Sequence, residues 1–151
     1  MTIRVMGAFF FAVLLTEFTD YASSDLKGNL IVEVDKLKNQ QGEVCYKLFS
    51  GSQGFPDSNE SAIQRQCVKI SNNSLTITLN NIRAGSYALS IYHDLNGDRK
   101  LNRNSLGMPS EGFGFSNNPV VRNAPPNYGD CLFLVAGNTR IKINLDYSLG
   151  N

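Results

Sequence analysis

Short runs of alternating apolar and polar residues constrain this chain more than any other feature of its sequence. The clearest run spans residues 75–79, where leucine, isoleucine and leucine alternate with threonine. Such alternation has the two-residue period of a β-strand with one buried face. No window keeps the period of an amphipathic helix, about 3.6 residues, over three turns, so the chain is predicted to be all-β.

Seven segments after residue 25 have a strand pattern. They are residues 30–34, 43–49, 62–70, 75–79, 86–93, 131–135 and 139–146. Turns rich in asparagine, glycine and serine separate most of them, at a spacing of roughly ten residues. This spacing predicts a single antiparallel β-sandwich of the immunoglobulin or transthyretin kind. The chain contains no tryptophan and therefore lacks the Cys–Trp–Cys pattern of a true immunoglobulin domain.

The first two dozen residues differ from the rest of the chain. Arg4 precedes an apolar run from Val5 to Leu15, and small residues occupy positions 22–24. The run is shorter than the roughly 20 apolar residues that a membrane span needs, so it has the pattern of a secretory signal peptide. We predict a signal peptide over residues 1–24 and one exported domain over residues 25–151, in the periplasm or outside the cell. A buried core helix is the alternative for the apolar run.

Charge and hydropathy exclude some partners for the mature chain. The sequence has 14 basic and 13 acidic residues, and these charges are spread along its length. It therefore lacks the basic footprint expected of a nucleic-acid-binding protein or of a protein bound to an anionic membrane surface. No second apolar stretch approaches spanning length, so no membrane span is predicted in the mature chain.

Three cysteines remain in the predicted mature chain: Cys45, Cys67 and Cys131. Exported proteins meet oxidising conditions, so two of the three are expected to form a disulfide. Cys45 and Cys67 lie in neighbouring predicted strands, which favours their pairing; three buried free thiols are the alternative. The chain has one histidine and no Cys-x-x-Cys motif, so a zinc site is not predicted.

A long stretch without a strand pattern, from Asp94 to Asp130, is where a function is expected. Loops longer than about 15 residues are uncommon in compact domains and are usually functional or disordered. This one contains eight large apolar side chains, which are costly to expose to water. They are Leu101, Leu106, Met108, Phe113, Phe115, Val120, Val121 and Tyr128. We therefore predict that the long loop packs over one end of the sandwich.

The first part of this loop has the oxygen spacing of a calcium loop of the EF-hand or dockerin type. The residues that would supply ligands are Asp94, Asn96, Asp98, Lys100 (through its backbone carbonyl) and Asn102. The match is incomplete, because position 12 is Ser105 rather than glutamate and Glu111 would have to fold back to replace it. Calcium is thus the candidate cofactor. The alternative is a turn whose Asp and Asn side chains bond their own backbone.

The second part of the loop, residues 107–118, alternates glycine with aromatic residues. It is predicted to form a lid, with Phe113 and Phe115 packed on the mouth of the sandwich while the glycines permit positive φ. The sharper alternative is a ligand groove with aromatic faces and polar groups. The residues that would then bind the ligand are His93, Glu111, Phe113, Phe115 and Asn117.

His93 extends the core-facing row of the strand over residues 86–93. Adjacent strand residues point to opposite faces, so His93 and Asp94 are not expected to form an oriented catalytic dyad. We predict a hydrogen-bonded histidine at the end of the core, and we assign no catalytic residue.

Several motifs together resemble a known family. They are residues 85–88 (Gly-Ser-Tyr-Ala), 93–97 (His-Asp-Leu-Asn-Gly), 100–102 (Lys-Leu-Asn) and 107–117 (Gly-Met-Pro-Ser-Glu-Gly-Phe-Gly-Phe-Ser-Asn). The similarity to the bacterial domain of unknown function family 2141 runs from Gly28 to Leu145. Members of that family often have aspartate where this chain has Asn102. The resemblance implies an exported protein with one small domain, and no established activity.

Two functions from different classes follow. The preferred one is a non-enzymatic exported binding or accessory module, with residues 94–118 as its working surface for an extracytoplasmic partner or ligand. The alternative is a small hydrolase or lyase that uses His93 with Glu111 or Asp94 as acid and base. A purely structural part of an envelope assembly is a third possibility.

Overall fold

Two β-sheets make up the computed structural model, which describes residues 26–72 and 74–150. The strands are β1 (Lys27–Asp35), β2 (Glu43–Phe49), β3 (Gln64–Lys69), β4 (Leu75–Arg83), β5 (Gly85–Asp94), β6 (Phe113–Phe115), β7 (Phe133–Val135) and β8 (Thr139–Asn144). Two 3₁₀ helices, η1 (Tyr128–Cys131) and η2 (Ser148–Gly150), complete the elements. The predicted signal peptide lies outside the described residues. Within them, no helix has the length and apolar character to cross a membrane.

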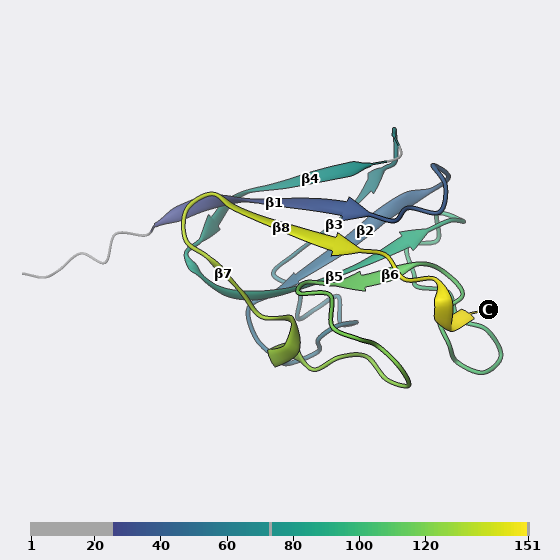
Figure 1. Ribbon diagram of the computed structural model, residues 1–151. Helices are drawn as coiled ribbons and strands as arrows, with labels where there is room; N and C mark the ends of the chain where they lie inside the picture. Colours follow the sequence, from purple (N-terminus) through teal and green to yellow (C-terminus); the bar gives the residue numbers. More distant parts are fainter. Residues whose placement is uncertain (1–25, 73, 151) are drawn as a thin grey trace, which may run out of the picture.

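The predicted β-sandwich is confirmed. One sheet has the strand order β4-β1-β8, and the other has the order β3-β2-β5-β6 with β7 also paired to β5. The sheets lie face to face as two layers (Figure 1). One pair departs from the expected antiparallel arrangement: β8 runs parallel to β1, with Leu30 opposite Thr139 and Asp35 opposite Asn144.

Strand β4 extends to Arg83, beyond residue 79 where the predicted strand ends. Leu30 of β1 faces Leu79, but Gly28 faces Ile82, so β4 has one extra residue at this point. Asn81 there has a φ of 59°. This is a β-bulge, and asparagine is one of the few residues that tolerate the left-handed conformation well. The Asn-Asn pair that resembled a turn therefore bends the strand without ending it.

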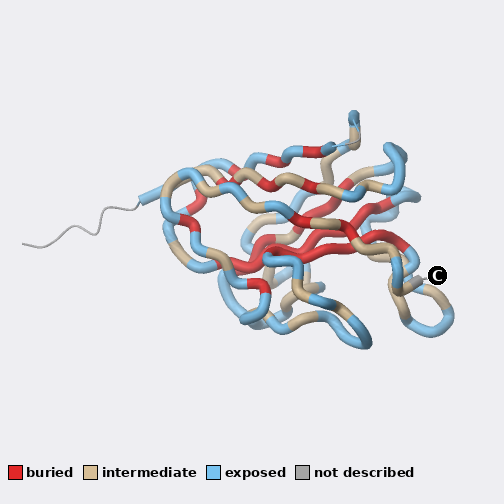
Figure 2. The backbone as a smooth tube through the Cα atoms, viewed as in Figure 1, coloured by how far each residue is buried: buried red, intermediate tan, exposed pale blue. Residues whose placement is uncertain are grey.

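The main core lies between the two sheets. Alternate residues of the strands point inward and are almost completely buried, as the red segments of Figure 2 show. The inward residues of β1, β2 and β5 include Leu30, Val32, Val34, Val44, Tyr46, Leu48, Leu89 and Ile91. The apolar residues of each alternating run thus face this core, and the residues between them lie on the outer face of the sheet.

A second, smaller core covers the outer face of the five-stranded sheet. Its buried members are Cys45, Ala88, Tyr92, Phe113, Phe115 and Cys131. Phe55, from the loop between β2 and β3, packs edge-on against Phe49 and Tyr128, with ring centroids 5.3 and 5.8 Å apart. The predicted long loop therefore has its second half on this outer face (Figure 1).

The glycine–aromatic segment is a strand rather than a lid. Strand β6 pairs with β5, so that Phe113 lies opposite Tyr92 and Phe115 opposite Ser90. The intervening Gly114 faces inward, where a Cβ atom would lie 2.7 Å from Ile143 Cγ2. The residue must be glycine because β6 approaches β8 closely here. The two phenylalanines consequently point away from the sandwich interior.

Side-chain hydrogen bonds close the seam between β6 and β8. Asn118 Nδ2 donates to the carbonyl of Lys142 (2.9 Å), and its Oδ1 accepts from the amide of Asn144 (2.7 Å). Phe113 and Asp146 exchange two backbone hydrogen bonds nearby. The Asn118 side chain thus takes the place of a neighbouring strand along this part of β8.

The predicted disulfide between Cys45 and Cys67 is present. The two cysteines lie directly opposite each other on β2 and β3 and point to the outer face of the sheet. Cys131 is a buried free thiol, and burial raises its pKa to about 11.

Candidate functional site

Two buried carboxylates hold the loop that follows β5. The Asp94 carboxylate is inaccessible and accepts hydrogen bonds from the amides of Gly97 (2.8 Å) and Arg99 (2.7 Å). Glu111 folds back onto the same loop, where its two oxygens accept from the amides of Leu95 (2.8 Å) and Asn102 (2.9 Å). Buried carboxylates are tolerated when they are bonded in this way. They fix the backbone of residues 95–102.

The exposed polar residues of this loop also bond one another. Asp98 Oδ2 lies 3.2 Å from Asn96 Nδ2 and 3.0 Å from Asn102 Nδ2, and Asp98 Oδ1 accepts from the amide of Lys100. The hydrogen bond from Asn102, with that from the Lys100 amide, holds the pKa of Asp98 below its usual range. These contacts are those of a self-capping turn.

These hydrogen bonds do not test whether the loop binds calcium, so the calcium site stays a prediction. Within the described part of the chain, the carboxylate oxygens of Asp94, Asp98 and Glu111 do not gather within 4.8 Å of one another. One described cluster meets that distance, Glu43 with Cys45 and Cys67, but its two sulfur atoms belong to the disulfide.

His93 is fully buried, and both of its ring nitrogens are engaged. Nε2 lies 2.6 Å from the carbonyl oxygen of Gln41, which can only accept, so Nε2 carries the proton. Nδ1 lies 2.7 Å from the Tyr147 hydroxyl oxygen, which accepts from the amide of Lys38. Within the described part of the chain, the His93 ring has no hydrogen bond to the carboxylate of Asp94 or Glu111. The structure therefore places His93 at the end of the core, as the strand pattern predicts.

Asn117 ties the segment after β6 to the segment before β7. Its Nδ2 donates to the carbonyl of Leu132 at 2.6 Å, and its backbone has a φ of 63°. The side chain is thus used within the protein rather than aimed into a cavity.

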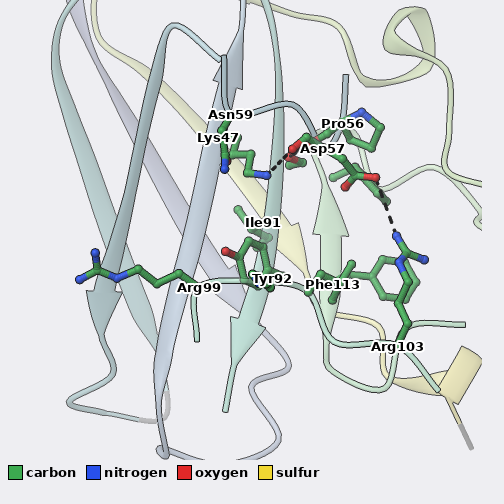
Figure 3. A pocket seen from close by; sticks show the side chains of 13 residues that line it. Lys47, Pro56, Asp57, Asn59, Ile91, Tyr92, Arg99, Arg103 and Phe113 are labelled. Carbon is green, nitrogen blue, oxygen red and sulfur yellow. Dashed lines mark hydrogen bonds and ion pairs between the residues drawn. The ribbon is translucent and has the colours of Figure 1, made fainter. Parts of the chain in front are cut away.

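A groove on the outer face of the five-stranded sheet brings several other side chains together. We call it the basic groove; its volume is about 260 Å³. Strands β2, β5 and β6 form its floor, and the loops after β2 and β5 form its walls (Figure 3). It is lined by Lys47, Pro56, Asp57, Asn59, Ser90, Ile91, Tyr92, Arg99, Lys100, Leu101, Arg103, Phe113 and Phe115. Of the predicted site residues, Lys100, Phe113 and Phe115 meet here, while His93, Glu111 and Asn117 do not line it.

The basic groove is strongly positive. Four cationic side chains and one carboxylate line it, a formal excess of three positive charges, whereas the whole chain carries a net charge of +1. Lys47 Nζ donates to the backbone carbonyl of Asp57 at 2.5 Å, and burial lowers the pKa of this lysine. The Asp57 carboxylate lies 3.8 Å from the Arg103 guanidinium.

An apolar recess of about 70 Å³ adjoins the basic groove. The two cavities share Pro56, Asp57, Leu101, Arg103, Phe113 and Phe115. The other apolar residues that line the recess include Met108, Pro109, Val121, Pro125 and Leu149. The site as a whole therefore has a charged part and an apolar part side by side.

Sequence reasoning missed Lys47, Tyr92, Arg99 and Arg103 as site residues. Lys47 and Tyr92 occupy outward positions of β2 and β5, a face that is commonly exposed to solvent in an antiparallel sheet. A usable signal was present in the cations at positions 99, 100 and 103, which follow the strand within a few residues.

A comparison with family models decides the relationship of this chain to other proteins. A model described as an uncharacterised protein conserved in bacteria (DUF2141) matches residues 32–143. The chain belongs to this family. The matched part of the DUF2141 domain contains every residue that lines the basic groove. No curated protein and no solved structure matches the chain.

Tyr92, on the groove floor of this DUF2141 domain, provides a test of the local electrostatics. Burial, together with the negative charges of Asp94, Asp98 and Glu111, raises its pKa from 10.0 to about 12. Between pH 10 and about pH 12, Tyr92 is deprotonated in the unfolded chain but stays protonated in the folded protein. The free energy of unfolding therefore falls as the pH rises, and the contribution that is present below pH 10 is lost by about pH 12. Unfolding by urea across this range should show a steeper loss of stability for the wild type than for Tyr92→Phe. Equal slopes would contradict the assigned pKa.

Proposed function

We propose that this DUF2141 domain is an exported, non-enzymatic binding module. Its working surface is the basic groove, together with the apolar recess and the rest of the segment from Asp94 to Asn118. The observation that carries the proposal is the concentration of cationic and aromatic side chains in a concave site, on a chain whose total net charge is only +1.

The polar residues outside the groove support binding rather than catalysis. A general base needs a free nitrogen or carboxylate within reach of a substrate proton. His93 uses both nitrogens in buried hydrogen bonds, and Asp94 and Glu111 accept backbone amides. These groups maintain the shape of the wall, so no specific contact within the described residues favours the hydrolase or lyase alternative.

The proposal predicts where small molecules bind. Amide NMR spectra of the exported protein, purified as the cell processes it, are recorded with a fragment set of anionic, neutral and cationic compounds. We expect chemical-shift changes to cluster at the groove residues, among them Lys47, Tyr92, Arg99, Arg103 and Phe113. Changes centred on the three-stranded sheet, or no changes with any fragment, would refute the proposal.

A matched pair of variants shows whether the groove itself is occupied. Asn59 is exposed on the groove wall, so Asn59→Trp should fill the groove and abolish the shift changes. Thr78→Trp adds the same bulk to an exposed position of β4 and should leave them intact.

The predicted calcium site is tested in the same spectra by adding calcium chloride. Binding by Asp94, Asn96, Asp98, Lys100 and Asn102 predicts saturable changes at the amides of residues 95–102, lost in Asp98→Asn. Spectra that do not change in this loop would remove calcium as a cofactor and leave the groove proposal standing.

A further inference from the structure

We infer that the basic groove and the apolar recess together bind a small amphipathic acid, with one carboxylate head and a short apolar tail. This inference rests on the proposed function and names its ligand class. The cavities shown are small: about 260 Å³ for the groove, near or below the roughly 300 Å³ at which drug-sized pockets begin. A site of this size suits a small molecule.

The head position is set by Lys47 and Arg103. Figure 3 shows both side chains directed toward Asp57 from different parts of the site, one from strand β2 and one from the loop after β5. The partner of Lys47 is a neutral carbonyl, and the partner of Arg103 is a solvent-exposed carboxylate. Exposed ion pairs contribute at most about 1 kcal/mol. A ligand carboxylate bound here takes the place of the exposed Asp57 carboxylate beside Arg103 and gives Lys47 an ionic partner where its hydrogen-bond acceptor is now a neutral carbonyl.

The tail position is set by the shared wall of the two cavities. Phe113 and Phe115 line both the groove and the recess, so a molecule can extend from one to the other across their rings. Beyond them the recess presents Met108, Pro109 and Val121. Removing a methylene group from water in such surroundings is favourable by about 0.8 kcal/mol.

The combination excludes simpler ligands. An inorganic anion would leave the apolar recess empty, and a neutral apolar molecule would further desolvate the half-buried ammonium group of Lys47 without forming an ion pair with it, which is costly. A carboxylate joined to a short alkyl chain satisfies both parts at once.

The test compares octanoate, butyrate and octanamide by calorimetric titration into the exported protein. We expect octanoate to bind more tightly than butyrate, by up to about fourfold for each added methylene group that becomes buried. Octanamide, which keeps the tail and lacks the charge, should bind about tenfold more weakly than octanoate.

Variants assign the head and the tail separately. Lys47→Gln and Arg103→Gln should each weaken octanoate binding about tenfold. Lys69→Gln and Arg140→Gln are the matched controls and should have no effect; Arg140→Gln removes an exposed ion pair with Glu33, as Arg103→Gln removes one with Asp57. Met108→Gln should reduce the advantage of octanoate over butyrate while leaving butyrate binding unchanged.

The outcomes separate this inference from the proposed function. Equal affinities for octanoate and octanamide, or unchanged affinity in both Lys47→Gln and Arg103→Gln, would overturn the acid head. Equal affinities for octanoate and butyrate would overturn the tail. Absence of binding by all three probes overturns the inference as a whole, whereas the binding-module proposal stands or falls on the fragment spectra.

Discussion

Replacement of Glu111 by glutamine is expected to lower the free energy of unfolding by about 3 kcal/mol. The carboxylate accepts the amides of Leu95 and Asn102 at a site where Glu111 is only 5% exposed. Glutamine offers a single acceptor oxygen, so one of these two backbone donors would face an NH₂ group. In a domain of this size the melting temperature should fall by about 10 °C. Amide hydrogen exchange at residues 95 and 102 should become faster.

The control for this variant is Glu60→Gln. Glu60 is exposed and hydrogen-bonds to Ser58, so its replacement should change stability by less than about 0.5 kcal/mol. If Glu111→Gln were as stable as Glu60→Gln, or left the exchange of residues 95 and 102 unchanged, the buried carboxylate would not be what holds the groove wall.

Loss of the disulfide is the second large expected effect. Cys45 and Cys67 are 22 residues apart, and in the chain-entropy model closing a loop of this length stabilises the fold by about 3 kcal/mol. The double variant Cys45→Ala/Cys67→Ala should therefore melt about 10 °C lower than the wild type. Thermal unfolding followed by circular dichroism measures the difference.

A reducing agent separates the disulfide from the side-chain substitutions. Reductant should lower the melting temperature of the wild type to near that of the double variant and leave the double variant unchanged. A wild-type protein whose disulfide is shown to be reduced but whose melting temperature does not move would contradict a stabilising role for this bond.

Much of the fold is predictable because the sandwich follows from local alternation. The inward residues of β2, Val44, Tyr46 and Leu48, were recognisable by their spacing, and so was the position of His93 on the inward row of β5. Two features of the fold could not be recognised from residue spacing. The parallel pairing of β8 with β1 joins segments about a hundred residues apart, and the Asn-Asn bulge in β4 has the same residues as a turn.

The candidate site was less predictable because its parts come from segments that are distant in sequence. Lys47 and Arg103 reach one groove only after the sheet places β2 beside β5 and the loops fold over the outer face. The oxygen-rich motif at residues 94–102 was visible in the sequence, but a calcium loop and a self-capping turn have the same composition. Only the hydrogen bonds of Asp94 and Glu111 show how the loop is held.

The two hydrogen bonds between the Asn118 side chain and β8 affect the tendency of this protein to aggregate at high concentration. Unpaired strand edges are templates for aggregation with other chains. By occupying the backbone groups of Lys142 and Asn144, Asn118 withdraws part of β8 from such pairing. Two other strands at the ends of the sheets are polar: β3 carries Arg65 and Lys69, and the outward residues of β4 include Thr76 and Thr78. Charged and polar edges of this kind resist edge-to-edge pairing, so these edges are expected to limit amyloid-like growth at high protein concentration.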